Sequence, residues 1–291
     1  MAVSDYAQTA ATNNITVRRN GSNIQGDAAD LVIERSGQAM TLVYVDGTQG
    51  WVVTDTGAEA DKAPDAEFIC ASSPCVATVG DYKVHTFTGP GTFTVNSVGN
   101  PAGSTQVDYL VVGGGGGGGS ACAAGGGGAG GYRESHNDCV SGPYTASPLA
   151  TPSSITVSAQ GYPIVVGGGG PGGSESATSN PGTVGTNSSA LGITSAGGGF
   201  GGANPNVGGI GGSGGGGAHF QGPGGSGNSP PVSPAQGRDG AQSNPAPIGD
   251  DAGGGGGGAI EDGNTDGSGH GGDGTTSSIN NSAVTRGGGG A

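Results

Sequence analysis

Positive charge is the scarcest property of this sequence. Its 291 residues include 8 Lys and Arg against 22 Asp and Glu, which gives a formal net charge of −14. Because nucleic-acid binding requires clustered cations, this balance argues against a nucleic-acid partner. Aromatic residues make up only 4% of the chain. No apolar run approaches the ~18 residues of a membrane-spanning helix, so we expect no membrane insertion.

Signals for secretion and for catalysis are also missing. Residues 1–6 have neither the basic start nor the apolar core of a secretory signal, so we expect the protein to be made in the cytoplasm and, if it works outside a cell, to get there without an ordinary signal peptide. The two lysines, Lys62 and Lys83, follow Asp and Tyr rather than Gly, which excludes a Walker A motif. Residues 211–215 formally fit G-x-S-x-G, but such a match is expected by chance in glycine-rich sequence. We therefore expect no enzymatic activity.

Glycine is what the chain has in excess, and it is unevenly placed. Of the 71 glycines, 60 lie in residues 113–291, about one residue in three. They form blocks that alternate with varied inserts, at 113–119, 125–131, 167–173, 197–202, 208–217, 253–258 and 287–290. Together with the patterns below, this divides the chain into a small β module at 1–57, a connector with a β-hairpin at 58–112, and a glycine-rich domain at 113–291.

The first two parts read as short antiparallel strands. β-Branched and aromatic runs occur at 15–17, 31–33, 41–45 and 51–53, separated by turn sequences such as Asn20-Gly21 and Asp46-Gly47. Residues 82–88 and 92–95 alternate in polarity around Gly89-Pro90-Gly91, which predicts a hairpin. No helical periodicity is sustained in this part, so its predicted fold is mainly β.

The glycine-rich part admits two interpretations. Gly/Ser-rich sequence is typical of flexible linkers. Glycine can also adopt the extended polyproline-II conformation with ~3 residues per turn, and rods without Cβ atoms could pack closely and bond to one another through their backbones. The regular blocks favour the second interpretation, a C-terminal bundle of polyglycine-II helices linked by loops. The strict Gly-X-Y period of collagen is absent.

Cysteines and acidic residues supply candidate cross-links and metal ligands. Cys70 with Cys75, and Cys122 with Cys139, form local pairs that suit disulfides, the alternative being free thiols. Zinc binding by Cys122, His136 and Cys139 would lack a fourth ligand. Asp262, Asn264, Asp266 and Asp273 match the spacing of a calcium loop, although the flanks are glycine and an Asx-turn explains the same residues. Calcium is therefore the one candidate cofactor.

Large side chains in the inserts are the candidate binding residues, because loops on a rigid scaffold often carry function. They are Tyr132, Arg133, His136, Tyr144, His219 and Phe220. Aromatic residues and Arg supply much of the energy of binding surfaces. The alternative is that these side chains cover the ends of the rods.

Several stretches resemble bacteriophage proteins. Residues 12–26 (TNNITVRRNGSNIQG), with LVYVD at 42–46 and GW at 50–51, resemble a small β module of phage tail-fibre and other virion proteins. YKVHTF at 82–87, GTFTV at 91–95 and VDYLVVGGG at 107–115 are similar to the segment that precedes the glycine-rich domain of phage fibres. In that family, tip adhesins contact the host through loops on stacked polyglycine-II rods.

The resemblance implies a non-enzymatic virion protein, a tail fibre or tip adhesin that binds a host surface protein or glycan. Its N-terminal module would contact other virion proteins or copies of itself in a homo-oligomer. In that family, further strands usually precede the point that corresponds to the start of this chain. We expect either that a neighbouring chain supplies them or that the module folds without them. The alternatives are a structural appendage or filament subunit without receptor binding, and an ice-binding bundle, which would need regularly spaced Thr or Ala.

Overall fold

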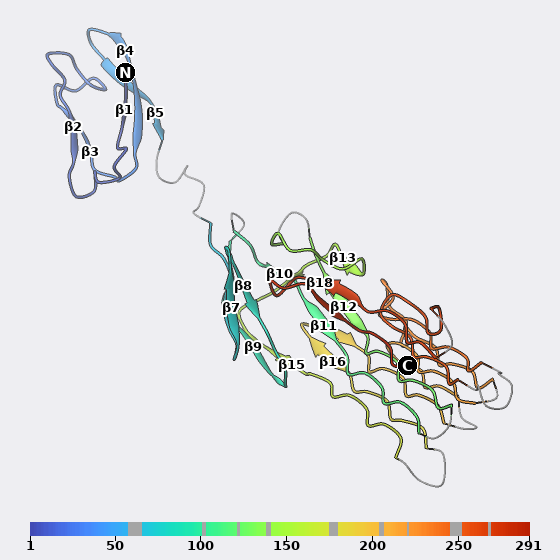
Figure 1. Cartoon of the computed structure of the whole chain (residues 1–291). Coiled ribbons are helices and arrows are strands. Elements are labelled where there is room, and N and C mark those ends of the chain that lie inside the picture. The colour runs from blue at the N-terminus through green and yellow to red at the C-terminus, as the bar shows by residue number, and fades with distance from the viewer. Residues whose placement is uncertain are drawn as a thin grey trace. The chain divides into compact units, whose positions relative to one another are not determined.

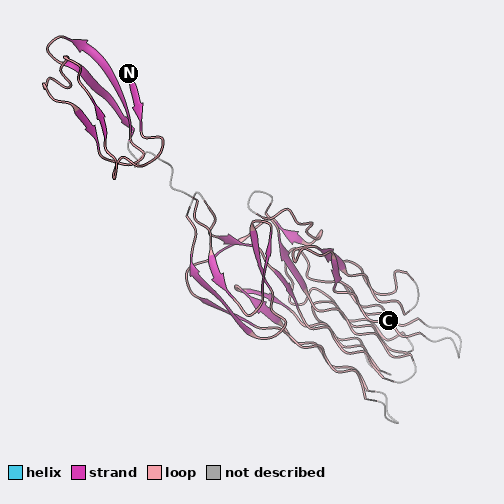
Figure 2. Ribbon diagram, turned by 60° about the vertical axis from the view of Figure 1, so that its left-hand side comes forward, coloured by secondary structure: helices cyan, strands magenta, loops and turns pink. Residues whose placement is uncertain are grey.

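The computed structural model describes residues 1–57, 66–100, 103–120, 123–137, 141–174, 180–203, 207–219, 221–244, 252–266 and 269–291. These residues form strands, turns and loops (Figure 2). They contain no helix, and hence none long and apolar enough to cross a membrane. The chain divides into two compact units, Met1–Ala66 and Glu67–Ala291. The division into three parts stays a prediction.

The first unit has two small sheets around an apolar core. One sheet has the order β1-β4-β5 and the other pairs β2 with β3, all antiparallel; the strands are β1 (Ala2–Ser4), β2 (Ile15–Val17), β3 (Leu31–Ile33), β4 (Ala39–Asp46) and β5 (Gly50–Gly57). Ile33, Met40 and Leu42 are buried in the core together with Ala10 and Ile24. The β-branched and aromatic runs that predicted strands in this unit do form them.

The second unit contains short sheets, in several of which strands that are distant in the sequence pair with one another. The strands are β6 (Cys70–Ser72), β7 (Val76–Val79), β8 (Tyr82–His85), β9 (Gly91–Ser97), β10 (Gln106–Val107), β11 (Leu110–Val112), β12 (Tyr132–Ser135), β13 (Ala150–Thr151), β14 (Ile155–Thr156), β15 (Gly161–Ile164), β16 (Ser188–Ala190), β17 (Ile193–Ser195), β18 (Thr275–Ser277) and β19 (Val284–Arg286). The sheets are β15-β9-β6, β7-β8, β10-β14, β11-β12-β13, β16-β17 and β18-β19 (Figure 1). Only the β12–β13 pair is parallel among these described strands.

The hairpin predicted from residues 82–95 is wrong. β8 pairs back with β7, while β9 lies between β6 and β15. The reason is packing: Phe93 and Val95 of β9 are buried against Val157 and Ile164, so β9 pairs with strands that carry this core rather than with β8.

The predicted bundle of polyglycine-II helices is also wrong, because the described residues contain no helix. The glycine blocks are extended loop segments that lie side by side (Figures 1 and 2). Segment 113–119 shows how they are held: its backbone hydrogen bonds run to other segments rather than within it. It bonds to residues 125–131, 167–173, 180–186 and 197–201 at N···O distances of 2.8–3.0 Å.

The hydrogen-bond partner changes along this segment with a repeat of three residues. Gly113, Gly116 and Gly119 donate to residues 125–131, whereas Gly114 and Gly117 donate to 183–186. Successive peptide groups therefore point in different directions around the segment axis. Each extended segment is thus bonded to several neighbours, and backbone groups that are buried find partners without any side chain.

Close approach of these segments explains why they consist of glycine. A Cβ atom built on Gly214 would lie 1.8 Å from the carbonyl oxygen of Gly225, and one on Gly216 would lie 1.7 Å from that of Gly254. Real Cβ atoms do not come so close to backbone atoms, so any other residue would force the segments apart. We call this close-packed array of glycine segments the glycine lattice.

Candidate functional site

A buried carboxylate lies where the glycine lattice meets the sheets. Glu134 of β12 is fully buried, and its Oε2 accepts hydrogen bonds from the Tyr132 hydroxyl at 2.8 Å and the Ser147 amide at 3.0 Å. The Ser277 hydroxyl of β18 donates to Oε1 at 2.6 Å. We call these four residues the junction cluster. The donors to Glu134 are neutral and satisfy both carboxylate oxygens, so the cluster ties β12, the loop at Ser147 and β18 together rather than presenting a reactive group.

Two tyrosines beside Glu134 are held protonated. Burial raises the pKa of Tyr132 well above its ordinary value. Burial, followed by the negative charges of Asp108 and Glu134, likewise raises the pKa of Tyr144. The Tyr144 hydroxyl donates to the Ser135 carbonyl at 2.7 Å, and its ring packs edge-on against His136 with centroids 4.6 Å apart.

Asp108 organises the neighbouring loop. Its carboxylate accepts hydrogen bonds from the hydroxyls of Ser135, Ser154 and Ser141, the first two at 2.8 and 2.7 Å. These serines come from β12 and from two separate loops. The surroundings of the predicted binding residues in this part of the chain are therefore an ordered, largely internal hydrogen-bond network.

The opposite end of the lattice is made of loop connections. Backbone bonds join Ser120 to Asn180, Gly125 to Gly202, Gly202 to Gly216, Gly217 to both Ala241 and Gly254, and Ser243 to Gly222. The Asn264 side chain accepts from Gly255. These bonds place the described residues of six connections at the same end, which we call the loop end: 120, 123–124, 174, 180, 203, 207, 217–219, 221–222, 242–244, 252, 264–266 and 269–270.

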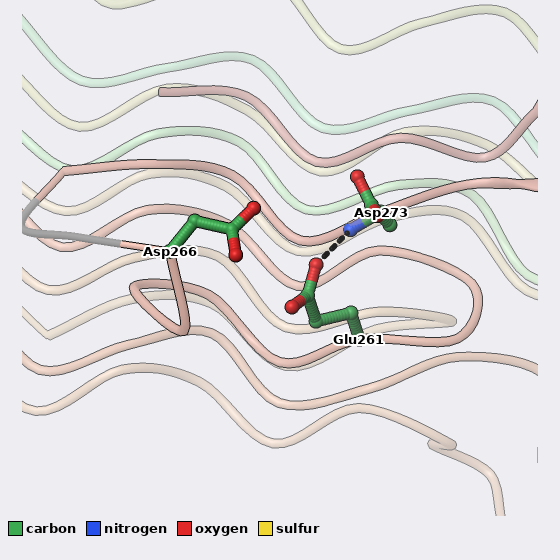
Figure 3. Close-up of side chains that lie close together, drawn as sticks. All are labelled: Glu261, Asp266 and Asp273. Atoms are coloured by element: carbon green, nitrogen blue, oxygen red, sulfur yellow. Dashed lines mark hydrogen bonds between the residues drawn. The ribbon is translucent and has the colours of Figure 1, made fainter.

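Three carboxylates converge near the segment that follows residue 258 (Figure 3). One oxygen from each of Glu261, Asp266 and Asp273 lies within 4.8 Å of the others. Glu261 also accepts a hydrogen bond from the Asp273 amide at 3.0 Å. Carboxylate oxygens are what Ca²⁺ and Mg²⁺ prefer, so these three residues could hold such a cation.

The predicted calcium loop is only partly reproduced in this cluster. Asp266 and Asp273 converge, whereas Asp262 accepts a bond from the Asp239 amide at 3.1 Å and Asn264 accepts from Gly255 and Gly269. Glu261 was missed; the signal was an additional acid directly before the loop. Calcium binding itself stays a prediction.

Comparison with known proteins identifies the family. The family model of a glycine-rich domain matches residues 87–291. The chain belongs to the glycine-rich domain family. No curated protein and no solved structure matches the chain.

Within the glycine-rich domain, the predicted binding residues differ in their accessibility. Tyr132 is 1% exposed and bonded to Glu134, so it cannot contact a receptor. Arg133, His136 and Tyr144 are half-buried, the last two against each other. His219 lies at the loop end, where its amide donates to Ala123 at 3.0 Å. Phe220 lies outside the described residues. Tyr132 was chosen wrongly because its burial depends on Ser147 and on the distant Ser277, which join it at Glu134 and which the sequence around Tyr132 does not indicate.

The cysteines are not cross-linked where they are described. Cys70 and Cys75 are exposed free thiols, so the disulfide predicted between them is not formed. Cys70 begins β6 and Cys75 directly precedes β7, and these strands belong to different sheets. The second predicted pair, Cys122 and Cys139, lies outside the described residues, as does the zinc site that they would form with His136.

Proposed function

We propose that this protein is a virion appendage of a tailed bacteriophage, a tail fibre or tip adhesin, which binds the host cell surface non-covalently. The proposal rests on the resemblance to phage fibre sequences, which covers residues 12–26, 42–46 and 50–51 in the first unit and 82–87, 91–95 and 107–115 in the second. Membership of the glycine-rich domain family is compatible with it. It includes no catalytic step, and it locates the protein on the virion.

The observation that carries the proposal is the loop end. The described residues of six connections meet at one end of the lattice, whose segments are fixed by inter-segment hydrogen bonds of about the ideal length. Binding residues are often found on loops that a rigid scaffold positions. The lattice has this form: its interior has almost no side chains, and sequence variety is concentrated in the connections.

The first unit supports an attachment role. Val43, Tyr44 and Val45 of β4 are consecutive and are 47%, 49% and 58% exposed, although the unit has its own apolar core. Exposed apolar stretches of this kind often mark protein contacts. We propose that this unit contacts other virion proteins or further copies of the chain.

Binding of the labelled full chain to a panel of bacterial strains tests the proposal. We expect retention on a subset of strains, with binding removed by excess unlabelled protein. Retention by no strain, together with self-assembly into filaments in electron micrographs, would contradict the proposal and support a structural subunit. Equal retention by every strain, uncompeted by unlabelled protein, would contradict specific recognition.

A further inference from the structure

We propose that one side of the glycine lattice is an interface through which two copies of this chain associate. We call this side the uncharged flank, and it consists of five described segments: 167–173, 180–187, 197–202, 208–212 and 222–227. The inference goes beyond the proposed function, because it gives the second unit a contact with a further copy whether or not the chain binds a host.

The five segments of the flank lie side by side in their order along the chain. Backbone hydrogen bonds with N···O distances of 2.7–3.0 Å join each segment to the next: Thr186 donates to Gly168, Gly185 to Gly198, Gly209 to Phe200, and Gly208 to Pro223. The first two segments form one border of the lattice (Figure 1). Exposed residues occur from the first segment to the last, so the flank reaches the surface along its width.

The flank differs from the rest of the molecule in charge. Its five segments contain no Asp, Glu, Lys, Arg or His. The exposed acidic side chains that the structure describes in the lattice lie on other segments, at Asp239, Asp262, Asp266 and Asp273. Because the whole chain has a formal charge of −14, two copies repel each other where acidic surfaces face one another. At the uncharged flank they can approach without that local repulsion.

The flank also exposes apolar side chains. Val184 is 46% exposed and Ile210 is 63% exposed, although most of the surrounding residues are glycine. Phe200 is half-buried between them in sequence, and its ring occupies the place where a Cβ atom of Gly209 would lie. Removing such side chains from water favours association.

The shape of the flank suits a second copy of itself. Segment 167–173 is a strip without large side chains, and at Gly168 an added Cβ would meet nothing within 4 Å. Val184 and Ile210 protrude from neighbouring segments. In a dimer with two-fold symmetry the same surface serves both copies. The protruding side chains of one copy then face the glycine strip of the other, so the chain itself supplies the complementary partner.

Sedimentation velocity of the full chain over a dilution series tests this association. We expect a reversible equilibrium between monomer and dimer. It should shift toward the dimer as salt rises from about 0.05 to 0.5 M, because salt screens the repulsion between two acidic copies and the flank has no ion pairs to weaken. A monomer at every concentration would overturn the proposal, as would a dimer that dissociates when salt is added.

A matched pair of variants assigns the contact to the flank. Ile210→Lys lies on the flank, whereas Ile260→Lys lies beside Glu261; the two isoleucines are 63% and 39% exposed. Both variants reduce the net negative charge by one, so the general repulsion between copies falls equally. Ile210→Lys brings two unpaired ammonium groups into an apolar contact, and we expect dimerisation at least about tenfold weaker. Ile260→Lys should dimerise at least as well as the unchanged chain.

Further variants decide between the flank and the first unit. Val184→Lys should repeat the loss from a second segment of the flank, and thermal unfolding confirms that each variant is folded. Unchanged dimerisation of folded Ile210→Lys and Val184→Lys would overturn the proposal. Loss of the dimer in Val43→Lys alone would place the contact on the first unit and overturn it as well. None of these outcomes depends on retention by a bacterial strain, so this inference and host binding fail separately.

Discussion

At the scale of single residues, the lattice predicts that glycines of different segments differ sharply in their tolerance of a methyl group. At Gly214 an added Cβ would lie 1.8 Å from a backbone oxygen, whereas at Gly168 it would meet nothing within 4 Å. We expect Gly214→Ala to destabilise the second unit by at least the 1–3 kcal/mol typical of overpacking. Gly168→Ala should be neutral, or stabilising by about 0.4–1 kcal/mol, because alanine restricts the unfolded chain.

Thermal unfolding followed by circular dichroism or calorimetry measures both variants. The two substitutions are chemically identical, so their difference isolates the packing of the segments. Equal and small effects would mean that the glycine segments do not pack as closely as the structure has them.

The buried tyrosines predict how stability responds to alkali. Burial raises the pKa of Tyr132 and Tyr144, so their phenols stay protonated in the folded chain after those of the unfolded chain ionise near pH 10. The folded state then binds more protons, and the free energy of unfolding falls as the pH rises above about 10. Urea unfolding between pH 8 and 11 measures this slope. Tyr144→Phe should make it shallower, and an unchanged slope in that variant would contradict the assignment.

At the scale of elements, the junction cluster predicts a specific coupling between distant strands. Glu134 of β12 accepts from Ser277 of β18, 143 residues along the chain. Glu134→Gln keeps the shape of the side chain but replaces one carboxylate oxygen, a hydrogen-bond acceptor, by an NH2 group, which is a donor. That donor faces either the Ser277 hydroxyl or the Tyr132 hydroxyl and the Ser147 amide. We expect a cost of about 1–3 kcal/mol, as for an unsatisfied buried group.

Hydrogen exchange locates that effect. In Glu134→Gln the amides of Gly289 and Gly290, which follow β18–β19 and bond to Gly272 and Gly127, should exchange faster than in the unchanged chain. Glu67→Gln removes the same charge from an exposed position of the same unit and serves as the control. Equal protection in the two variants would mean that Glu134 does not hold these strands together.

Elements differed in how far the sequence could predict them. Runs of β-branched residues between turn sequences were sufficient for β2 to β5, because local preference and burial agree there. They were not sufficient for β9, whose partners β6 and β15 are set by a core assembled from distant segments. Glycine blocks carry no side-chain pattern, so composition suggested helices where the structure has extended segments bonded between neighbours.

The candidate sites show the same limit. The spacing of a calcium loop predicted Asp266 and Asp273 as metal ligands. Glu261 lies beside them only because its segment folds back after residue 258, where the Gly258 amide donates to the Glu261 carbonyl at 2.8 Å. Tyr132 looked like a binding residue because aromatics are rare in this half of the chain. The burial that removes it from the surface comes from Glu134, Ser147 and Ser277, of which the last is distant in sequence.

At the scale of the whole molecule, a core made of backbone predicts an unusual heat capacity of unfolding. Exposing apolar surface raises the heat capacity and exposing polar surface lowers it; ordinary proteins gain about 12–15 cal/mol/K per residue, or about 3.5–4.4 kcal/mol/K for 291 residues. In the described part of this chain, apolar clusters centre on Leu42 in the first unit and Phe93 in the second, while the glycine lattice buries peptide groups. We therefore expect a value well below that range. Calorimetry at several pH values gives it from the dependence of the unfolding enthalpy on melting temperature, and a value inside the ordinary range would contradict a backbone core.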